Sequence, residues 1–235
     1  MEELSEGFWL ALLGLFLGNG GAEPPTEPLS PGSAAPYLVQ QMSYADTWSM
    51  LFVIERAYEL AGISVNDTLM WHEQPFDEIV NWYSPEDETI TIASLPLDHQ
   101  IAPYWDNWSK ALTGSRWDWR ASFVDETEAR EMARFNQFVL AAHEYGHALT
   151  YRFDPDHLGR NDHAINCREY PADRLAAGLL EEFAAEDENF ARWRLRYAEL
   201  AADINAHVGK TERYGEVSFQ ELESNCAILD VDQPT

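Results

Sequence analysis

The sequence has little positive charge and little cysteine. Its 235 residues include 15 Lys and Arg against 41 Asp and Glu, which gives a formal net charge of −26 at pH 7. A surface this negative repels phosphate groups, so nucleic-acid binding is not expected. The two cysteines, Cys167 and Cys226, do not by themselves make a zinc site. They would form a disulfide in an exported protein and remain buried thiols in a cytosolic one.

The chain also lacks a long apolar run. No stretch of about 18 or more hydrophobic residues is present, so we expect no integral membrane span. The compact run Phe8–Leu17 has the length of a signal-peptide core, and Gly20, Gly21 and Ala22 offer small residues for cleavage. Acidic residues precede this run where a signal peptide carries basic ones. We therefore expect export to the periplasm or the exterior, with or without an N-terminal anchor, and a cytoplasmic location is the alternative.

Aromatic residues are plentiful, and this favours a folded domain. Hydrophobic residues make up 46% of the chain and aromatic residues 13%, including nine Trp, whereas a disordered acidic chain is poor in aromatics. Residues 1–22 form the signal-like hydrophobic segment. Residues 23–36 hold five prolines and read as a solvated linker. The remaining residues, 37–235, are long enough for one domain.

The hydrophobic pattern predicts mostly helices, over residues 44–62, 69–83, 126–152, 169–187 and 190–207. Asp125 is placed to cap the long third helix, and acids follow it in the first turn. The alternating, β-branched Thr89-Ile90-Thr91-Ile92 predicts a strand after a turn. Residues 154–167 read as a loop. The region 102–122 is ambiguous, and its tryptophans would either pack in the core or line a cleft: Trp105, Trp108, Trp117 and Trp119.

The segment that bears on function is His143-Glu144-Tyr145-Gly146-His147, within the long predicted helix. Residues four apart share a helix face, so the two imidazoles can bind one ion from the same side. Glu144 lies on an adjacent face, close enough to reach a water bound to that ion. This is the His-Glu-x-x-His pattern of catalytic zinc sites. The alternative is a polar patch on a solvated helix.

A catalytic zinc ion needs a third protein ligand and keeps its fourth position for water. Metzincins carry a Gly and then a third His, three and six residues after the second His. Thr150 and Phe153 occupy those positions here, which excludes that pattern. The other common solution takes a Glu from a following helix, where Glu169 is available. Asp173 lies on the same helix face and can accept the N–H of a ligand imidazole. The alternative for both acids is favourable placement near a helix start.

The arrangement resembles the gluzincin metallopeptidases, the thermolysin-like clan. HEYGHAL followed by EYPADRLAAGLL is similar to the small single-domain bacterial members, which carry HExGHAL and then an E-x-x-A-D helix. The upstream YSPEDETITI is similar to their Tyr-x-Pro turn and strand. The resemblance covers residues 80–185 and is strongest at the zinc motif.

The resemblance implies a fold and a set of roles. The fold is α+β, a zincin-like metallopeptidase domain with a small sheet, an edge strand and a long active-site helix. The strand at 89–94 would be the sheet edge along which an extended peptide binds. By this resemblance, His143, His147 and Glu169 would be the Zn²⁺ ligands. Glu144 would be the general base, and Asp173 would orient His143.

The chain departs from the larger members of the clan. It lacks room for their full C-terminal helical domain, and their downstream His or Tyr that steadies the oxyanion is not identifiable. The candidates for that role are His207 and Tyr214, followed by His163.

The predicted function is zinc-dependent hydrolysis of peptide bonds in a peptide or protein substrate. Zinc would lower the pKa of its bound water and polarise the scissile carbonyl. Glu144 would take the water proton and pass it to the leaving amine. The first alternative is a catalytically weak or inactive zincin-like binding or regulatory protein. The second is a structural exported protein in which the motif is accidental. The sequence does not determine the oligomeric state.

Overall fold

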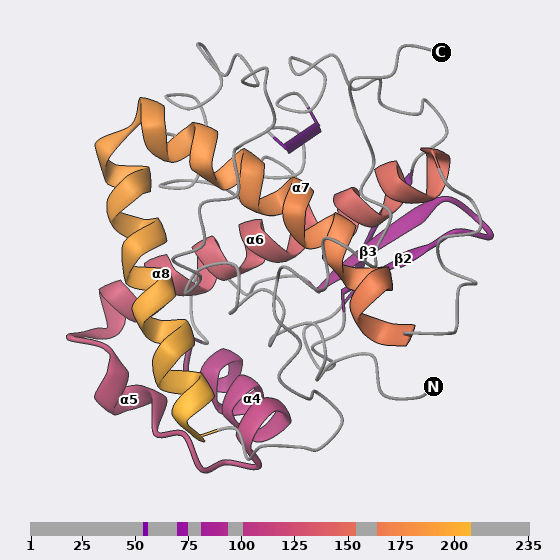
Figure 1. The fold of residues 1–235 in the computed structure, drawn as a ribbon. Coiled ribbons are helices and arrows are strands. Elements are labelled where there is room, and N and C mark those ends of the chain that lie inside the picture. The colour runs from indigo at the N-terminus through magenta and orange to yellow at the C-terminus, as the bar shows by residue number, and fades with distance from the viewer. Residues whose placement is uncertain (1–53, 56–69, 75–80, 94–100, 154–163, 208–235) are drawn as a thin grey trace.

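The computed structural model describes residues 54–55, 70–74, 81–93, 101–153 and 164–207. The signal-like segment, the linker and most of the helix predicted over 44–62 lie outside these residues. The described part is mostly helical with one small sheet, an α+β arrangement (Figure 1). Its elements are β1 (Met70–Gln74), β2 (Trp82–Ser84), β3 (Thr89–Ala93), α4 (Ile101–Thr113), α5 (Trp119–Ser122), α6 (Glu126–Phe153), α7 (Ala164–Glu186) and α8 (Glu188–His207).

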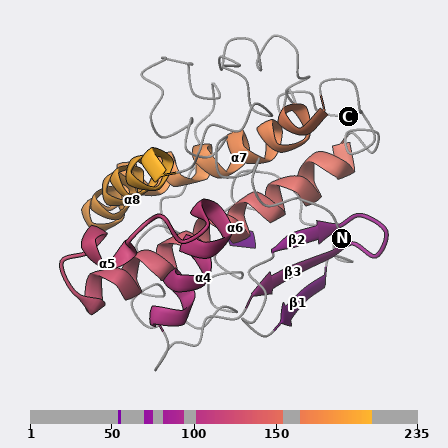
Figure 2. The same cartoon turned by 90° about the horizontal axis from the view of Figure 1, so that it is seen from below.

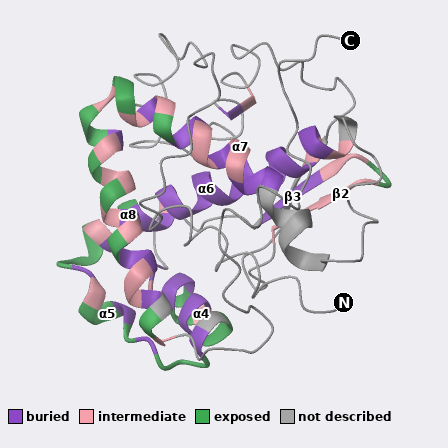
Figure 3. Cartoon of the chain, in the orientation of Figure 1, coloured by how far each residue is buried: buried purple, intermediate pink, exposed green. Residues whose placement is uncertain are grey.

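Helix α6 is the centre of the arrangement. It lies between α7 on one side and the sheet on the other, as Figure 2 shows, and it contacts β2 and β3 directly. Helices α4 and α8 pack against α6, and α8 also packs against α7. This position between other elements makes α6 largely buried (Figure 3). None of the described helices combines the length and the apolar character needed to cross a membrane.

The predicted long helix is confirmed, together with its cap. The Glu128 backbone N–H donates to Asp125 Oδ1 at 2.9 Å, and the Val124 N–H donates to Glu128 Oε2 at 2.5 Å. These bonds satisfy backbone donors that a helix N-terminus leaves without partners, and the acids suit the positive end of the helix dipole. The local sequence therefore fixes where α6 begins.

The two helices predicted after α6 are also confirmed, with one shifted boundary. Helix α7 begins at Ala164 rather than near residue 169, so residues 164–167, predicted as loop, are helical. A helix that began near residue 169 would have Pro171 in its first turn, where the missing N–H of proline costs nothing. Pro171 instead lies inside α7.

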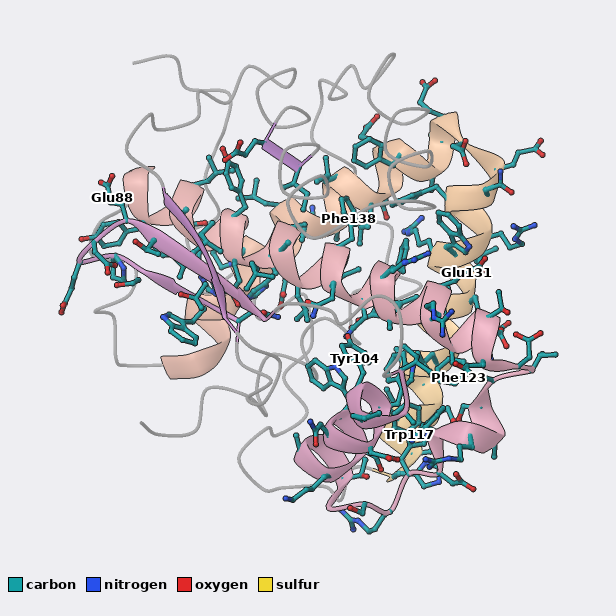
Figure 4. All side chains as sticks on the ribbon, turned by 180° about the vertical axis from the view of Figure 1, so that it is seen from behind. Glu88, Tyr104, Trp117, Phe123, Glu131 and Phe138 are labelled. Carbon is teal, nitrogen blue, oxygen red and sulfur yellow. The ribbon has the colours of Figure 1, made fainter. Side chains whose placement is uncertain are left out.

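The sheet has the order β1-β3-β2, with β3 in the centre. Strand β3 pairs in parallel with β1 and antiparallel with β2. The β2–β3 turn ends at Glu88, labelled in Figure 4, whose φ is 50°. The predicted strand is confirmed, but its expected place at the sheet edge is wrong. Over Thr89–Thr91, β3 has a partner on both sides, so its backbone hydrogen-bonding groups there are not available to a peptide, and β1 and β2 are the outer strands of the described sheet.

The helix predicted over 69–83 is also wrong where the structure describes that range. Residues 70–74 form β1 and residues 82–84 belong to β2. The pairing of both segments with β3 provides backbone partners that the local sequence does not reveal. A tertiary interaction has therefore overridden the local helical pattern.

The tryptophan-rich region forms α4 and α5, and its four tryptophans are buried in the core rather than lining a cleft. The indole N–H groups of Trp105, Trp117 and Trp119 donate hydrogen bonds inside the protein. Trp105 donates to the Ala129 carbonyl at 2.9 Å, and Trp117 donates to Asp203 Oδ2 at 2.9 Å. Figure 4 shows Trp117 and Phe123 in this region, with Phe138 further along α6. The aromatic residues thus fasten α4, α5 and α8 around the first half of α6.

Candidate metal centre

The two histidines of the motif lie one turn apart in the second half of α6. Their ring centroids are 4.5 Å apart, and the ring planes are nearly perpendicular at 87°. Both side chains are buried, with exposed fractions of 1% for His143 and 7% for His147. The pair therefore belongs to the interior of the protein and not to a solvated helix face, which was the alternative interpretation of the motif.

Helix α7 supplies the partner of the first histidine. His143 Nδ1 lies 2.7 Å from Asp173 Oδ1, and both side chains are almost completely buried. An ionised carboxylate can only accept a hydrogen bond, so Nδ1 carries the proton and donates it. In the neutral ring this leaves the lone pair on Nε2. The contact expected between Asp173 and His143 is present, and it fixes the orientation of the ring.

Glu144 is buried beside this pair, with an exposed fraction of 6%. Acidic side chains are rarely buried to this extent unless they are paired, because removing a charge from water costs free energy. The second half of α6 and the facing part of α7 therefore bury four ionisable groups close together in the fold. Such concentrations are typical of functional sites.

Two tyrosines that the sequence analysis did not select border the same part of α6. Tyr151 follows His147 by one turn, and its ring centroid lies 6.0 Å from that of Tyr83 on β2. Burial, followed by the charges of Glu88, Tyr151 and Asp87, raises the pKa of Tyr83 to about 12. Its phenol therefore keeps its proton to a higher pH than an ordinary tyrosine does. The available sequence signal was the spacing of Tyr151, which repeats the four-residue step of the histidines.

Of the remaining predicted site residues, the structure describes the side chain of His207 alone. Glu169 belongs to α7, one turn before Asp173, but its side chain lies outside the described residues, as do Tyr214 and His163. The structure does not bring His207 to the histidine pair. His207 occupies the last turn of α8, where its Nδ1 lies 2.8 Å from the Asp203 carbonyl oxygen. The side chains of Cys167 and Cys226 are not described, so the predicted disulfide stays a prediction.

No family model, curated protein or solved structure matches the chain. The fit to zinc can be judged from the donor set. Zinc binds imidazole nitrogens and carboxylate oxygens, and a ligand histidine usually donates its other N–H to a carboxylate, as His143 does to Asp173. The described residues contain no group of three or more His, Cys, Asp or Glu placed to hold a metal ion. They supply two imidazoles and a supporting carboxylate, which fit part of a zinc site.

Proposed function

We propose that this chain is a zinc-dependent peptidase of the gluzincin type, with a zincin-like fold. The observation that carries the proposal is the buried His143–Asp173 hydrogen bond, which joins the histidine motif of α6 to α7. A histidine held in one tautomer by a buried carboxylate is the usual support for a metal ligand. A solvated helix face would need no such partner.

His143 and His147 would bind Zn²⁺ through ring nitrogens, with Nε2 as the donor of His143. We propose Glu169 as the third ligand, because α7 places it one turn from Asp173. When bound, the ion supplies Lewis-acid chemistry, since it lowers the pKa of a water ligand and polarises a carbonyl group. Asp173 would hold His143 in place while substrate enters and product leaves.

Glu144 would act as the general base. Its carboxylate would accept a proton from the attacking water and later donate that proton to the leaving amine. It follows His143 directly in α6, so the helix that positions a ligand also positions the base. Its burial keeps bulk water from competing for the proton. No covalent intermediate between enzyme and substrate is needed.

The expected substrate is an extended peptide of neutral or basic character. The net charge of −26 makes a polyanionic substrate unfavourable. If the peptide adds to the sheet as a further strand, it would pair with β1 or β2, because β3 is flanked on both sides. Of these two edge strands, β2 contacts α6 directly.

The test of the proposal compares Glu144→Gln with wild type in the digestion of a peptide library. We expect Glu144→Gln to keep its zinc and to lose activity by about 100-fold or more, since a positioned base contributes roughly 100- to 10,000-fold. Glu131→Gln is the matched control, because Glu131 is exposed on the same helix. Adding a chelator should abolish wild-type cleavage. Full activity of Glu144→Gln would refute the proposed role.

A zincin-like binding or regulatory protein without useful turnover is the second candidate. It is favoured by the position of His207, the first candidate for the oxyanion role, whose Nδ1 lies 2.8 Å from the Asp203 carbonyl oxygen in the last turn of α8 and not at the histidine pair. The same digestion separates the two functions. A wild-type chain that holds zinc but cleaves no peptide in the library would support the binding protein and contradict the peptidase.

A further inference from the structure

Helices α6 and α7 come into close backbone contact at Gly146, a glycine of the histidine motif. A Cβ atom placed on Gly146 would lie 2.8 Å from the carbonyl oxygen of Ala172 and 2.9 Å from its Cα. Both are backbone atoms of α7, so no side-chain rotation can relieve the overlap. One of the two helices would have to move.

The close approach lies beside the buried hydrogen bond. Gly146 is between the two histidines of α6, and Ala172 immediately precedes Asp173 in α7. Aspartate has a short side chain, so its reach of 2.7 Å to His143 Nδ1 depends on the spacing of the two helices. A hydrogen bond weakens steeply as its donor and acceptor separate. The spacing set at Gly146 therefore determines whether Asp173 can hold the ring.

A glycine inside a helix also needs an explanation. Glycine is unfavourable in helix interiors, because it loses more backbone freedom on folding than other residues. Gly146 lies well inside α6, and its carbonyl oxygen accepts a bond from Thr150 Oγ1 at 2.7 Å. Gly178 in α7 has a different environment, since a Cβ atom placed there meets nothing within 4 Å. Among the glycines of the described residues, the close contact is specific to Gly146.

We propose that Gly146 is a positioning residue, whose missing side chain lets α7 approach α6 closely enough for Asp173 to orient His143. The inference about zinc affinity rests on the proposed function, whereas the inference about the His143–Asp173 bond does not. Glu169, being on α7 as well, would move with Asp173 if the helices separated. A single methyl group at position 146 would then disturb both the proposed third ligand and the support of the first.

The first test uses the metal-free protein and needs no zinc. In wild type the His143 Nδ1–H proton should give a downfield NMR signal that is protected from solvent exchange. The signal should be lost in Gly146→Ala and retained in Gly178→Ala, the matched control. A retained, protected signal in Gly146→Ala would overturn the proposal, even if the chain proved to bind no zinc.

The second test measures zinc affinity by competition with a chelator. Gly146→Ala should lower the affinity by about 10- to 100-fold, as loss of a supporting carboxylate does, and Gly178→Ala should leave it unchanged. In an Asp173→Asn background, Gly146→Ala should have a smaller effect, because the support of His143 is already weakened and the displacement of Glu169 is the main effect that remains. Additive effects would overturn the proposal, since they would mean that Gly146 acts independently of the His143–Asp173 bond.

The third test asks whether a longer side chain suits a wider spacing. Asp173→Glu should lower zinc affinity when Gly146 is present, because glutamate is too long for the native gap. In the Gly146→Ala background, the same change should restore part of the affinity. If Gly146→Ala does not fold, Asp173→Glu alone decides: an unchanged affinity would overturn the proposal. Wild type that binds no zinc would refute the proposed function, and the NMR test would still decide the role of Gly146.

Discussion

Both halves of α6 bury apolar side chains, but only the second half also buries ionisable ones. In the first half, Phe135 and Phe138 pack against aromatic side chains of the two other helices, with ring centroids 5.2 to 6.1 Å apart. These partners are Phe183 of α7 and Phe190 and Tyr197 of α8. The second half contributes His143, Glu144 and His147 and meets Asp173. One continuous helix therefore serves two regions, which we call the aromatic half and the ionisable half.

A gain in folding stability explains why the side chains of the aromatic half are buried, but it does not explain the burial of the ionisable half. Burying an apolar side chain of this size stabilises a protein by roughly 1.5–3 kcal/mol. Burying charged or strongly polar groups costs free energy, and even a well-paired buried ion pair is often no better than an apolar replacement. The aromatic half is accounted for by folding alone. The ionisable half is better accounted for by a chemical role, which is the basis of the proposed zinc site.

The largest expected effect on stability belongs to the aromatic half. Phe138→Ala should lower the free energy of unfolding by about 3–5 kcal/mol, because it removes a fully buried ring and leaves a cavity. Urea denaturation would measure the loss. The zinc content of the protein that remains folded should not change. A loss below about 1 kcal/mol would contradict the assignment of this half as the main core.

The next effect belongs to the ionisable half. Asp173→Asn should lower zinc affinity by about 10- to 100-fold, because an amide is a weaker acceptor for the His143 N–H and does not raise the basicity of the ring. Chelator competition gives the affinity. Asp106→Asn is a suitable control, since Asp106 is exposed and accepts hydrogen bonds from Trp119 and Arg120 outside the site. Equal affinities for Asp173→Asn and wild type would remove the functional explanation for this half.

The smallest expected effect is a loss of folding stability in alkaline solution, and it comes from tyrosines that pack beside the two halves of α6. Burial raises the pKa of Tyr104 and Tyr197 above the usual value of 10.0, and burial raises the pKa of Tyr83 to about 12. A raised pKa means that the folded state holds its proton more tightly than the unfolded state. The stabilisation is therefore complete below pH 10 and is lost as the pH rises through the folded-state values.

Urea denaturation between neutral pH and about pH 12 would follow this loss, with tyrosinate absorbance as a second signal. The Tyr83→Phe variant should lose less stability than wild type as the pH rises from 10 toward 12. An unchanged free energy of unfolding across that range would mean that these phenols are not buried as described.

The sequence predicts best where the signals are local. The Asp125 cap, the acids of the first turn and the four-residue step from His143 to His147 all lie within α6, so its start and the histidine pair could both be read from neighbouring residues. The contact between Asp173 and His143 could be expected as well, because a ligand imidazole normally has a carboxylate partner. These features needed no knowledge of the tertiary structure.

The features that the sequence did not predict depend on distant contacts. Strand β1 forms because β3 supplies its backbone partners, and the same pairing moves β3 from the edge to the centre of the sheet. The overlap at Gly146 is visible only once the carbonyl oxygen of Ala172 is in place. His207 could not be rejected from the sequence, because its distance from the histidine pair is set by the packing of α8 and not by its spacing along the chain.

The most direct test of the central claim is the zinc content of the purified protein by elemental analysis. After loading with zinc and removal of excess metal, wild type should hold one zinc ion per chain, and His147→Ala should hold far less. His207→Ala, which changes a histidine outside the site, should match wild type. Wild type without bound zinc, or His147→Ala with as much zinc as wild type, would contradict the account.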